Sequence, residues 1–398
     1  MGKLKISSRN EIMQASPIRK LAPLAVKAKA EGVHVYHLNI GQPDIKTSQK
    51  MIDAYHNIPE VIEYGPSEGL HSYRKKLVQY YKKMKIDVNE SNIFITTGGS
   101  EAIIFTLLSA LSPGDEVIIP EPFYTNYNGF AVMAGVNVVP VTTNIENGFD
   151  LPDMKEFKAK LTPRTKAIVI CNPGNPTGAV FKKERLQELV DFARKHDLYV
   201  ISDEVYREFT YDCKATSILQ FDDFEENAVM IDSTSKRYSA CGSRVGCIVT
   251  RNKELLGLVL KFGQARLCPP SVDQQAAEAA VDTPDSYFEE VHKEYTKRRN
   301  VAYKELKKIP GAEVPMPMGA FYMVVGLPID DADDFAKWLL TDFRHNKETT
   351  MVAPASGFYA TPGLGKNQIR IAYVLKEADL IKAINILKIG LEEYKKKK

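Results

Sequence analysis

The sequence lacks the features that mark several common classes of protein. Its 398 residues include five cysteines, an odd number with no Cys-x-x-Cys pair, which argues against a disulfide framework or a zinc site and favours a reducing cytoplasm. The seven histidines show no metal-ligand spacing. No apolar run approaches the roughly 20 residues that a membrane span needs, and the first residues lack the apolar core of a secretory signal. We therefore expect a cytoplasmic protein without a bound metal or a membrane partner.

An excess of charge of one sign is also lacking. The 53 basic and 50 acidic residues leave a net charge of +3, which does not favour a large nucleic-acid-binding surface. The 44% hydrophobic and 26% charged residues are an ordinary globular balance, and a chain of this length usually divides into two or three domains. The composition thus predicts a globular protein of two or three domains.

The middle of the chain alternates short apolar runs with amphipathic stretches. Strands are expected at residues 92–96, 116–119, 166–171, 198–202 and 228–231, with helices at 100–111 and 182–196. This alternation predicts an α/β domain at about residues 47–282, with a mostly parallel sheet flanked by helices. After Pro284, which is expected to open a long helix reaching about Ile309, the rhythm becomes irregular. Residues 1–46 and 283–398 are therefore expected to form a smaller α+β domain.

Residues suited to one cofactor follow five of the expected strands. Ligands of parallel sheets bind at the carboxyl ends of the strands, and the first of these ends carries a Gly-Gly turn before a helix, which suits a phosphate. The next four carry Tyr124, Asn175, Asp203 and Lys236. Each has a plain structural explanation when taken alone: a turn, a packed aromatic ring, a tight loop, an exposed carboxylate, a solvated lysine. Their occurrence at consecutive strand ends favours a shared site.

The order of the motifs resembles the class I/II, fold-type I pyridoxal-phosphate aminotransferases, a family that includes aspartate and aromatic aminotransferases. The likeness runs from about Ile40 to Arg370 and comprises, in order, GQPD, YGP, TGGSEA, PFY, NPTG, SDEVY, STSK, SRVG, GAFY and RIAY. Each motif is short, but chance is a poor explanation for the whole series. The resemblance implies pyridoxal 5'-phosphate as cofactor and a homodimer with shared active sites.

The resemblance also implies catalytic roles. Lys236 matches the lysine that holds the cofactor as a Schiff base and moves the Cα proton. Asp203 matches the carboxylate beneath the pyridine nitrogen, which keeps that nitrogen protonated. Tyr206 and Asn175 match the pair that hydrogen-bonds the ring oxygen.

Further matches concern the cofactor's phosphate and ring. Gly99 and Ser100 match the backbone donors to the phosphate, and Ser233 and Arg244 match its side-chain partners. Tyr124 matches the residue that stacks on the ring.

The remaining matches concern the substrate and the neighbouring subunit. Arg370 matches the arginine that clamps the substrate α-carboxylate, with the N–H of Gly41 and with Asn175 beside it. Tyr64 matches the tyrosine that reaches the phosphate in the neighbouring subunit.

The sequence departs from the family pattern in three places. Tyr124 stands where many aspartate-specific relatives have Trp, and Ser100 stands where aspartate-type relatives often have Lys. The loop Arg237–Cys241 does not have the common form. The first two departures weaken an aspartate assignment without excluding it.

The implied reaction is the transfer of an amino group from an L-amino acid to a 2-oxo acid such as 2-oxoglutarate. An aspartate-like donor is favoured, with aromatic amino acids and alanine as alternatives. A C–S lyase of the same fold would use the same core residues. A non-catalytic cofactor-bound regulator is disfavoured, because such relatives carry an extra helix-turn-helix domain and only about 46 residues precede the expected large domain.

Overall fold

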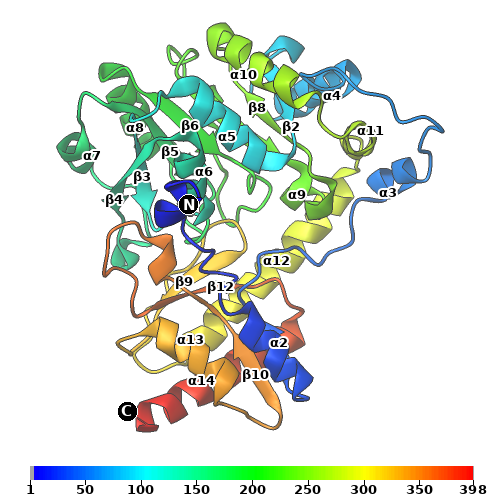
Figure 1. Ribbon diagram of the computed structural model, residues 1–398. Coiled ribbons are helices and arrows are strands. Elements are labelled where there is room, and N and C mark those ends of the chain that lie inside the picture. The colour runs from blue at the N-terminus through cyan, green and yellow to red at the C-terminus, as the bar shows by residue number, and fades with distance from the viewer. Residues whose placement is uncertain (1–3, 398) are drawn as a thin grey trace.

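A seven-stranded sheet forms the centre of the larger part of the molecule (Figure 1). The computed structural model describes residues 4–397. In sheet order the strands are β2 (Ile93–Thr96), β8 (Gly246–Val249), β7 (Ala228–Ser233), β6 (Tyr199–Asp203), β5 (Thr165–Cys171), β3 (Glu116–Glu121) and β4 (Asn137–Thr142). All neighbouring pairs are parallel except those of β8, which runs antiparallel to both β2 and β7. The expectation of a mostly parallel sheet is thus confirmed.

Both faces of this sheet are buried, because side chains alternate between two separate hydrophobic cores. Ile118 of β3 packs into one core, and its neighbours Val117 and Ile119 pack into the other. The first core also receives side chains from α4 (His71–Lys83), α7 (Met154–Lys160) and α8 (Lys183–Lys195). The second receives them from α5 (Gly98–Ala110), α6 (Asn126–Ala134) and α10 (Lys253–Arg266). Helices therefore cover both faces, as the continuous apolar strands predict.

Two smaller sheets lie in the other part of the molecule, at the bottom of Figure 1. One pairs β1 (His34–His37) with β10 (Glu348–Met351) in parallel. The other is antiparallel and has the order β11 (Ala353–Pro354), β12 (Gln368–Ala372), β9 (Tyr322–Gly326). Helices α2 (Ala22–Ala30), α13 (Ala332–Thr341) and α14 (Glu377–Lys397) pack around them. The pairing of β1 with β10 joins the two ends of the chain.

Three further helices connect or border the two parts. The 22-residue helix α12 (Asp285–Leu306) runs from the large part into the small part, where it packs on α14. Helix α3 (Gln49–Tyr55) packs on α11 (Ser271–Ala280), and the short α1 (Arg9–Ile12) is the first element of the described chain. We propose that the domains divide near residues 47 and 282, since the strands of the large sheet all lie between these positions.

Element boundaries differ from the expected ones where turns intervene. Helix α12 begins directly after Pro284 as expected, and it ends at Leu306, three residues before the expected end. Strand β9 begins at Tyr322, inside the GAFY motif, because Ala320 adopts a left-handed φ of 54° that an extended strand does not allow. Helix α5 begins at Gly98, so both glycines lie in its first turn.

Two absences hold for residues 4–397. No helix in this range is long and apolar enough to cross a membrane. Nor does this range contain a group of three or more metal-type side chains that could hold an ion.

Candidate active site

A cavity of about 620 Å³ opens at the carboxyl ends of the parallel strands, between the two parts of the molecule. Its lining comes from the N-terminal segment, α2, α5, β6, α9 (Thr234–Arg237), β9 and β12. Every predicted site residue except Tyr64 lines it: Gly41, Gly99, Ser100, Tyr124, Asn175, Asp203, Tyr206, Ser233, Lys236, Arg244 and Arg370. The fold thus brings together side chains that are more than 300 positions apart in the sequence.

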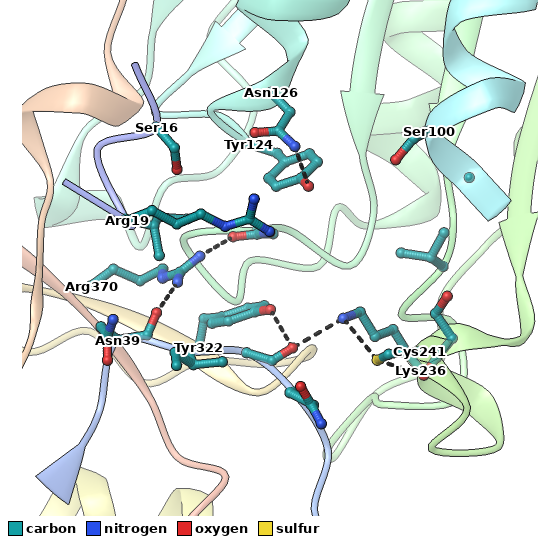
Figure 2. Close-up of a pocket in the computed structure, with 18 of the residues that line it drawn as sticks. Ser16, Arg19, Asn39, Ser100, Tyr124, Asn126, Lys236, Cys241, Tyr322 and Arg370 are labelled. Carbon is teal, nitrogen blue, oxygen red and sulfur yellow. Dashed lines mark hydrogen bonds between the residues drawn. The ribbon is translucent and has the colours of Figure 1, made fainter. Parts of the chain in front are cut away.

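Lys236 projects into this cavity from α9, the short helix that follows β7 directly (Figure 2). Its Nζ donates a hydrogen bond to the backbone oxygen of Gly41 at 3.0 Å and lies 3.7 Å from Sγ of Cys241. Among the described residues no carboxylate forms an ion pair with it. The amine is half-buried and is not neutralised by an acid, which suits a nucleophile and proton carrier.

Asp203 ends β6 and is 5% exposed. The hydroxyl of Tyr127 donates to its Oδ2 at 2.8 Å, and the N–H of Val205 donates to Oδ1 at 3.4 Å. Burial raises the pKa of Asp203 to about 6, although both hydrogen bonds act to lower it. No cation among the described residues pairs with this carboxylate, so a cationic group in the cavity would offset the cost of burying it. Sequence reasoning missed Tyr127, which lies in the first turn of α6, three residues after Tyr124.

An anion cradle forms where α5 begins. The N–H groups of its first turn, including those of Gly99 and Ser100, have no partner within the helix. The guanidinium of Arg244 lies against this turn: a Cβ built at Gly98 would be 2.3 Å from its Nη2. Ser233 lies alongside as the N-cap of α9. A helix N-terminus, a guanidinium and a hydroxyl together suit a phosphate.

Arg370 lies on β12 and is 2% exposed. Its Nη1 donates to Oδ1 of Asn175 at 3.1 Å and its Nη2 to the backbone oxygen of Asn39 at 2.5 Å, whereas its Nε is buried without a hydrogen-bond partner. Desolvation lowers the pKa of this guanidinium. A buried cation that lacks an acidic partner and retains an unpaired donor is suited to the carboxylate of a ligand.

Hydrogen bonds connect this arginine to Lys236 across the cavity. Nδ2 of Asn175 donates to the hydroxyl of Tyr206 at 3.5 Å, and that hydroxyl lies 3.0 Å from the hydroxyl of Tyr322. Tyr322 in turn donates to the oxygen of Gly41 at 3.4 Å, the same oxygen that Lys236 contacts. Burial raises the pKa of Tyr206 well above its ordinary value, which keeps the hydroxyl protonated as a donor.

Sequence reasoning did not assign a role to Tyr322. Its signal was the GAFY motif, in which it is the last residue. Close packing explains the glycine opposite it, because a Cβ at Gly41 would lie 1.8 Å from the Tyr322 hydroxyl. The Tyr322 ring also lies 4.5 Å from the Arg370 guanidinium. Tyr322 is therefore part of the wall that positions both residues.

Two predicted residues remain, and of these Tyr124 lines the cavity whereas Tyr64 lies on the outer surface. Tyr124 lines the upper wall in Figure 2, where Nδ2 of Asn126 donates to its hydroxyl at 2.8 Å. Tyr64 is 82% exposed and does not reach the cavity of its own chain.

A buried ion-pair network surrounds Arg237, the first residue of the unusual loop after Lys236. Arg237 is 4% exposed, forms an ion pair with Asp232 and lies 4.0 Å above the ring of Tyr80. Arg207 approaches the same Asp232 carboxylate at 3.4 Å. Since Asp232 and Arg237 flank the turn that carries Lys236, their pairing holds that turn in place.

An α/β fold with a cationic cavity at its strand ends is suited to binding small anionic molecules. The family model for aminotransferases of class I and II matches residues 33–387. The chain therefore belongs to this family and is an aminotransferase.

Similar proteins share nearly the whole chain. An aspartate aminotransferase from Pyrococcus horikoshii is 32% identical over 98% of this chain and 98% of its own. An aromatic-amino-acid aminotransferase from Thermococcus litoralis is 31% identical over 98% of this chain and 100% of its own. Among solved structures, an alanine aminotransferase from Pyrococcus furiosus superimposes with a TM-score of 0.90 and 29% identity, covering 98% of this chain and 100% of that one. An aspartate aminotransferase from Thermus thermophilus with maleate superimposes with a TM-score of 0.89 and 27% identity, again covering 98% of this chain and 100% of that one.

Proposed function

We propose that the protein uses pyridoxal 5'-phosphate to move an amino group from an aspartate-like L-amino acid to a 2-oxo acid such as 2-oxoglutarate. One observation carries this proposal: Lys236 and the buried carboxylate of Asp203 line the same cavity, beside an anion cradle. Of the donors that the relatives' names mention, aspartate recurs most often, with aromatic amino acids and alanine as alternatives.

The donor set fits the cofactor. Asp203 would pair with a protonated ring nitrogen, which supplies the cation that its burial calls for. The phosphate would be held by Gly99, Ser100, Ser233 and Arg244. A Cβ at Gly98 would lie 2.3 Å from Nη2 of Arg244, so the glycine lets the backbone approach this guanidinium closely. When bound, the cofactor supplies an aldehyde carbon that accepts amino groups and a ring that accepts electrons from the substrate Cα.

The cofactor's ring and reactive carbon have their own protein partners. Tyr124 would cover the ring, since it lines the same cavity as the cradle. Tyr206 and Asn175 would donate to the ring oxygen. The amine of Lys236 is the group available to bond the aldehyde carbon.

The protein's own side chains would then orient the substrate and move its proton. Arg370 would bind the α-carboxylate with its unpaired Nε and an adjacent nitrogen, and Asn175 would hold that guanidinium at 3.1 Å. The N–H of Gly41 would add a donor to the same carboxylate. Lys236, anchored at 3.0 Å by the carbonyl of Gly41, would carry the Cα proton from one face.

We further propose a homodimer in which Tyr64 contacts the partner's cofactor phosphate. Apolar side chains cluster on the extended segment before it: Ile58, Val61 and Ile62 are 48%, 70% and 62% exposed. Tyr64 itself is exposed, although an aromatic side chain normally gains by burial. Contact with a second copy would cover this segment. The five unpaired cysteines support a reducing, cytoplasmic setting.

The test is a panel of amino donors offered to the cofactor-loaded protein with 2-oxoglutarate. We expect glutamate to form from 2-oxoglutarate, most rapidly with aspartate, and Lys236→Ala to abolish the activity. Lys261→Ala, which alters an exposed lysine on α10, is the matched control and should keep full activity. Full activity in Lys236→Ala would refute the proposal, and release of pyruvate and ammonia from cysteine or cystathionine without an acceptor would instead indicate a C–S lyase.

A further inference from the structure

The cavity holds more positive charge than the cofactor and one carboxylate would neutralise. Its charged lining consists of five cations and one acid: Arg19, Lys29, Lys236, Arg244, Arg370 and Asp203. In the proposed function Lys236, Arg244 and Asp203 serve the cofactor, and Arg370 serves the α-carboxylate. Arg19 and Lys29 are left over, and a further anionic group on the substrate would account for at least one of them.

Of these two cations, Lys29 already has a partner. Its Nζ lies 2.7 Å from Nε2 of His37. The side chain of Arg19 forms no hydrogen bond or ion pair among the residues that the structure describes. Figure 2 shows its guanidinium extending into the cavity above that of Arg370 and below Tyr124.

The backbone around Arg19 is held on both sides. Pro17 is buried against Gly357, where a Cβ would lie 2.3 Å from its ring. Lys20 forms an ion pair with Asp333 at the start of α13. The N–H groups of Arg19 and Lys20 both donate to the oxygen of Ser16, at 3.1 and 3.0 Å. Arg19 is therefore presented from an anchored turn, which lowers the entropic cost of using it as a ligand.

The charges of Arg19 and Arg370 both act on the hydroxyl of Tyr124. Burial raises the pKa of Tyr124 to about 12, and the charges of Arg370 and Arg19 both oppose this rise. The two guanidinium groups thus flank one region of the cavity. Ser100, which lines the same cavity, is uncharged and offers no competing cation.

We propose that Arg19 binds the distal carboxylate of dicarboxylic substrates, while Arg370 binds their α-carboxylate. The substrate class is then the dicarboxylic amino acids and their 2-oxo acids. This inference rests on the proposed aminotransfer reaction and deepens it by naming a specificity-determining residue. Two separate guanidinium groups match the two carboxylates of such a molecule, whereas a neutral side chain would leave Arg19 unused.

The test compares Arg19→Gln with the unchanged protein, both loaded with cofactor. We expect kcat/KM for aspartate and glutamate to fall about 10- to 100-fold, because a charge-assisted hydrogen bond is lost, and kcat/KM for alanine to change less than about threefold. Lys27→Gln, which removes an exposed α2 cation outside the cavity, should leave kcat/KM unchanged for all three donors.

Binding without turnover gives a second measurement. Maleate, a dicarboxylate, should bind Arg19→Gln at least about 10-fold more weakly than the unchanged protein, and butyrate, a monocarboxylate, should bind both equally. Titration of the cofactor's absorbance with each acid measures this. Equal losses for all donors, or none for aspartate and maleate, would overturn the role of Arg19. If the unchanged protein transaminates no donor, the proposed function itself fails, while the maleate titration still decides the role of Arg19.

Discussion

The burial of Asp203 before the cofactor binds should weaken the cofactor-free protein, and the size of the effect can be worked out. The pKa of Asp203 is raised by desolvation from 3.8 to about 6. At about 1.4 kcal/mol per pKa unit, holding this carboxylate charged in the folded state costs about 3 kcal/mol. The folded-state pKa lies above the unfolded one. The cost is therefore absent below about pH 4, where Asp203 is protonated in both states, and it reaches its full size as the pH rises through 6.

The substitution Asp203→Asn removes this cost together with the charge. In the cofactor-free protein we expect the variant to be more stable at pH 8, even though it loses aminotransferase activity. Its advantage in the free energy of unfolding should grow by about 1.5 kcal/mol between pH 5 and pH 8, roughly half of the total titration effect. Binding of a cationic ring should lower the pKa of Asp203, so the loaded protein should not show the same growth.

Urea unfolding at several pH values measures this difference. Asp222→Asn is the matched control, because Asp222 is exposed and its carboxylate forms no hydrogen bond or ion pair among residues 4–397. If the stability curves of Asp203→Asn and the unchanged protein run parallel from pH 5 to pH 8, as those of the control should, the carboxylate is not desolvated and the reasoning is refuted.

Three other experiments test separate parts of the molecule. Arg370→Ala should lower kcat/KM for all amino donors by roughly 100-fold, about 3 kcal/mol, because a bidentate contact to the α-carboxylate is lost; an unchanged value would mean that another arginine binds this group. Arg237→Ala should reduce the free energy of unfolding by about 3 kcal/mol, because Asp232 loses a buried partner, and a loss below about 0.5 kcal/mol in urea would show that the pair is not structural. Tyr64→Ala and Lys236→Ala are each expected to be impaired, and refolding them as a mixture should restore part of the activity through hybrid dimers; a mixture no more active than its parts would argue against shared sites.

The part of the site that the sequence predicted from its own pattern lies at the strand ends. Asn175, Asp203 and Lys236 each follow a continuous apolar run, and parallel strands bring such positions to one edge. The geometry of neighbouring strands therefore converts local sequence signals into a shared site. The central sheet was predictable for the same reason.

The other residues depend on contacts that no local pattern encodes. Gly41 and Arg370 were reached only through the family resemblance, because their positions depend on how the small part packs against the sheet. Tyr322 lies 281 positions from Gly41 in the sequence and contacts its carbonyl. Arg19 looks like any exposed cation until the turn at Ser16 presents it to the cavity. Strand β8 was likewise missed, because its four residues are too few to show a hydrophobic period.

The attachment of the cofactor to Lys236 is the claim on which the mechanism depends. Reduction of the cofactor-loaded protein with borohydride, followed by digestion and mass mapping, locates the lysine that carries the cofactor. We predict a single modified peptide whose added mass lies on Lys236. A modification on any other lysine, or none in a protein that has bound the cofactor, would contradict the account.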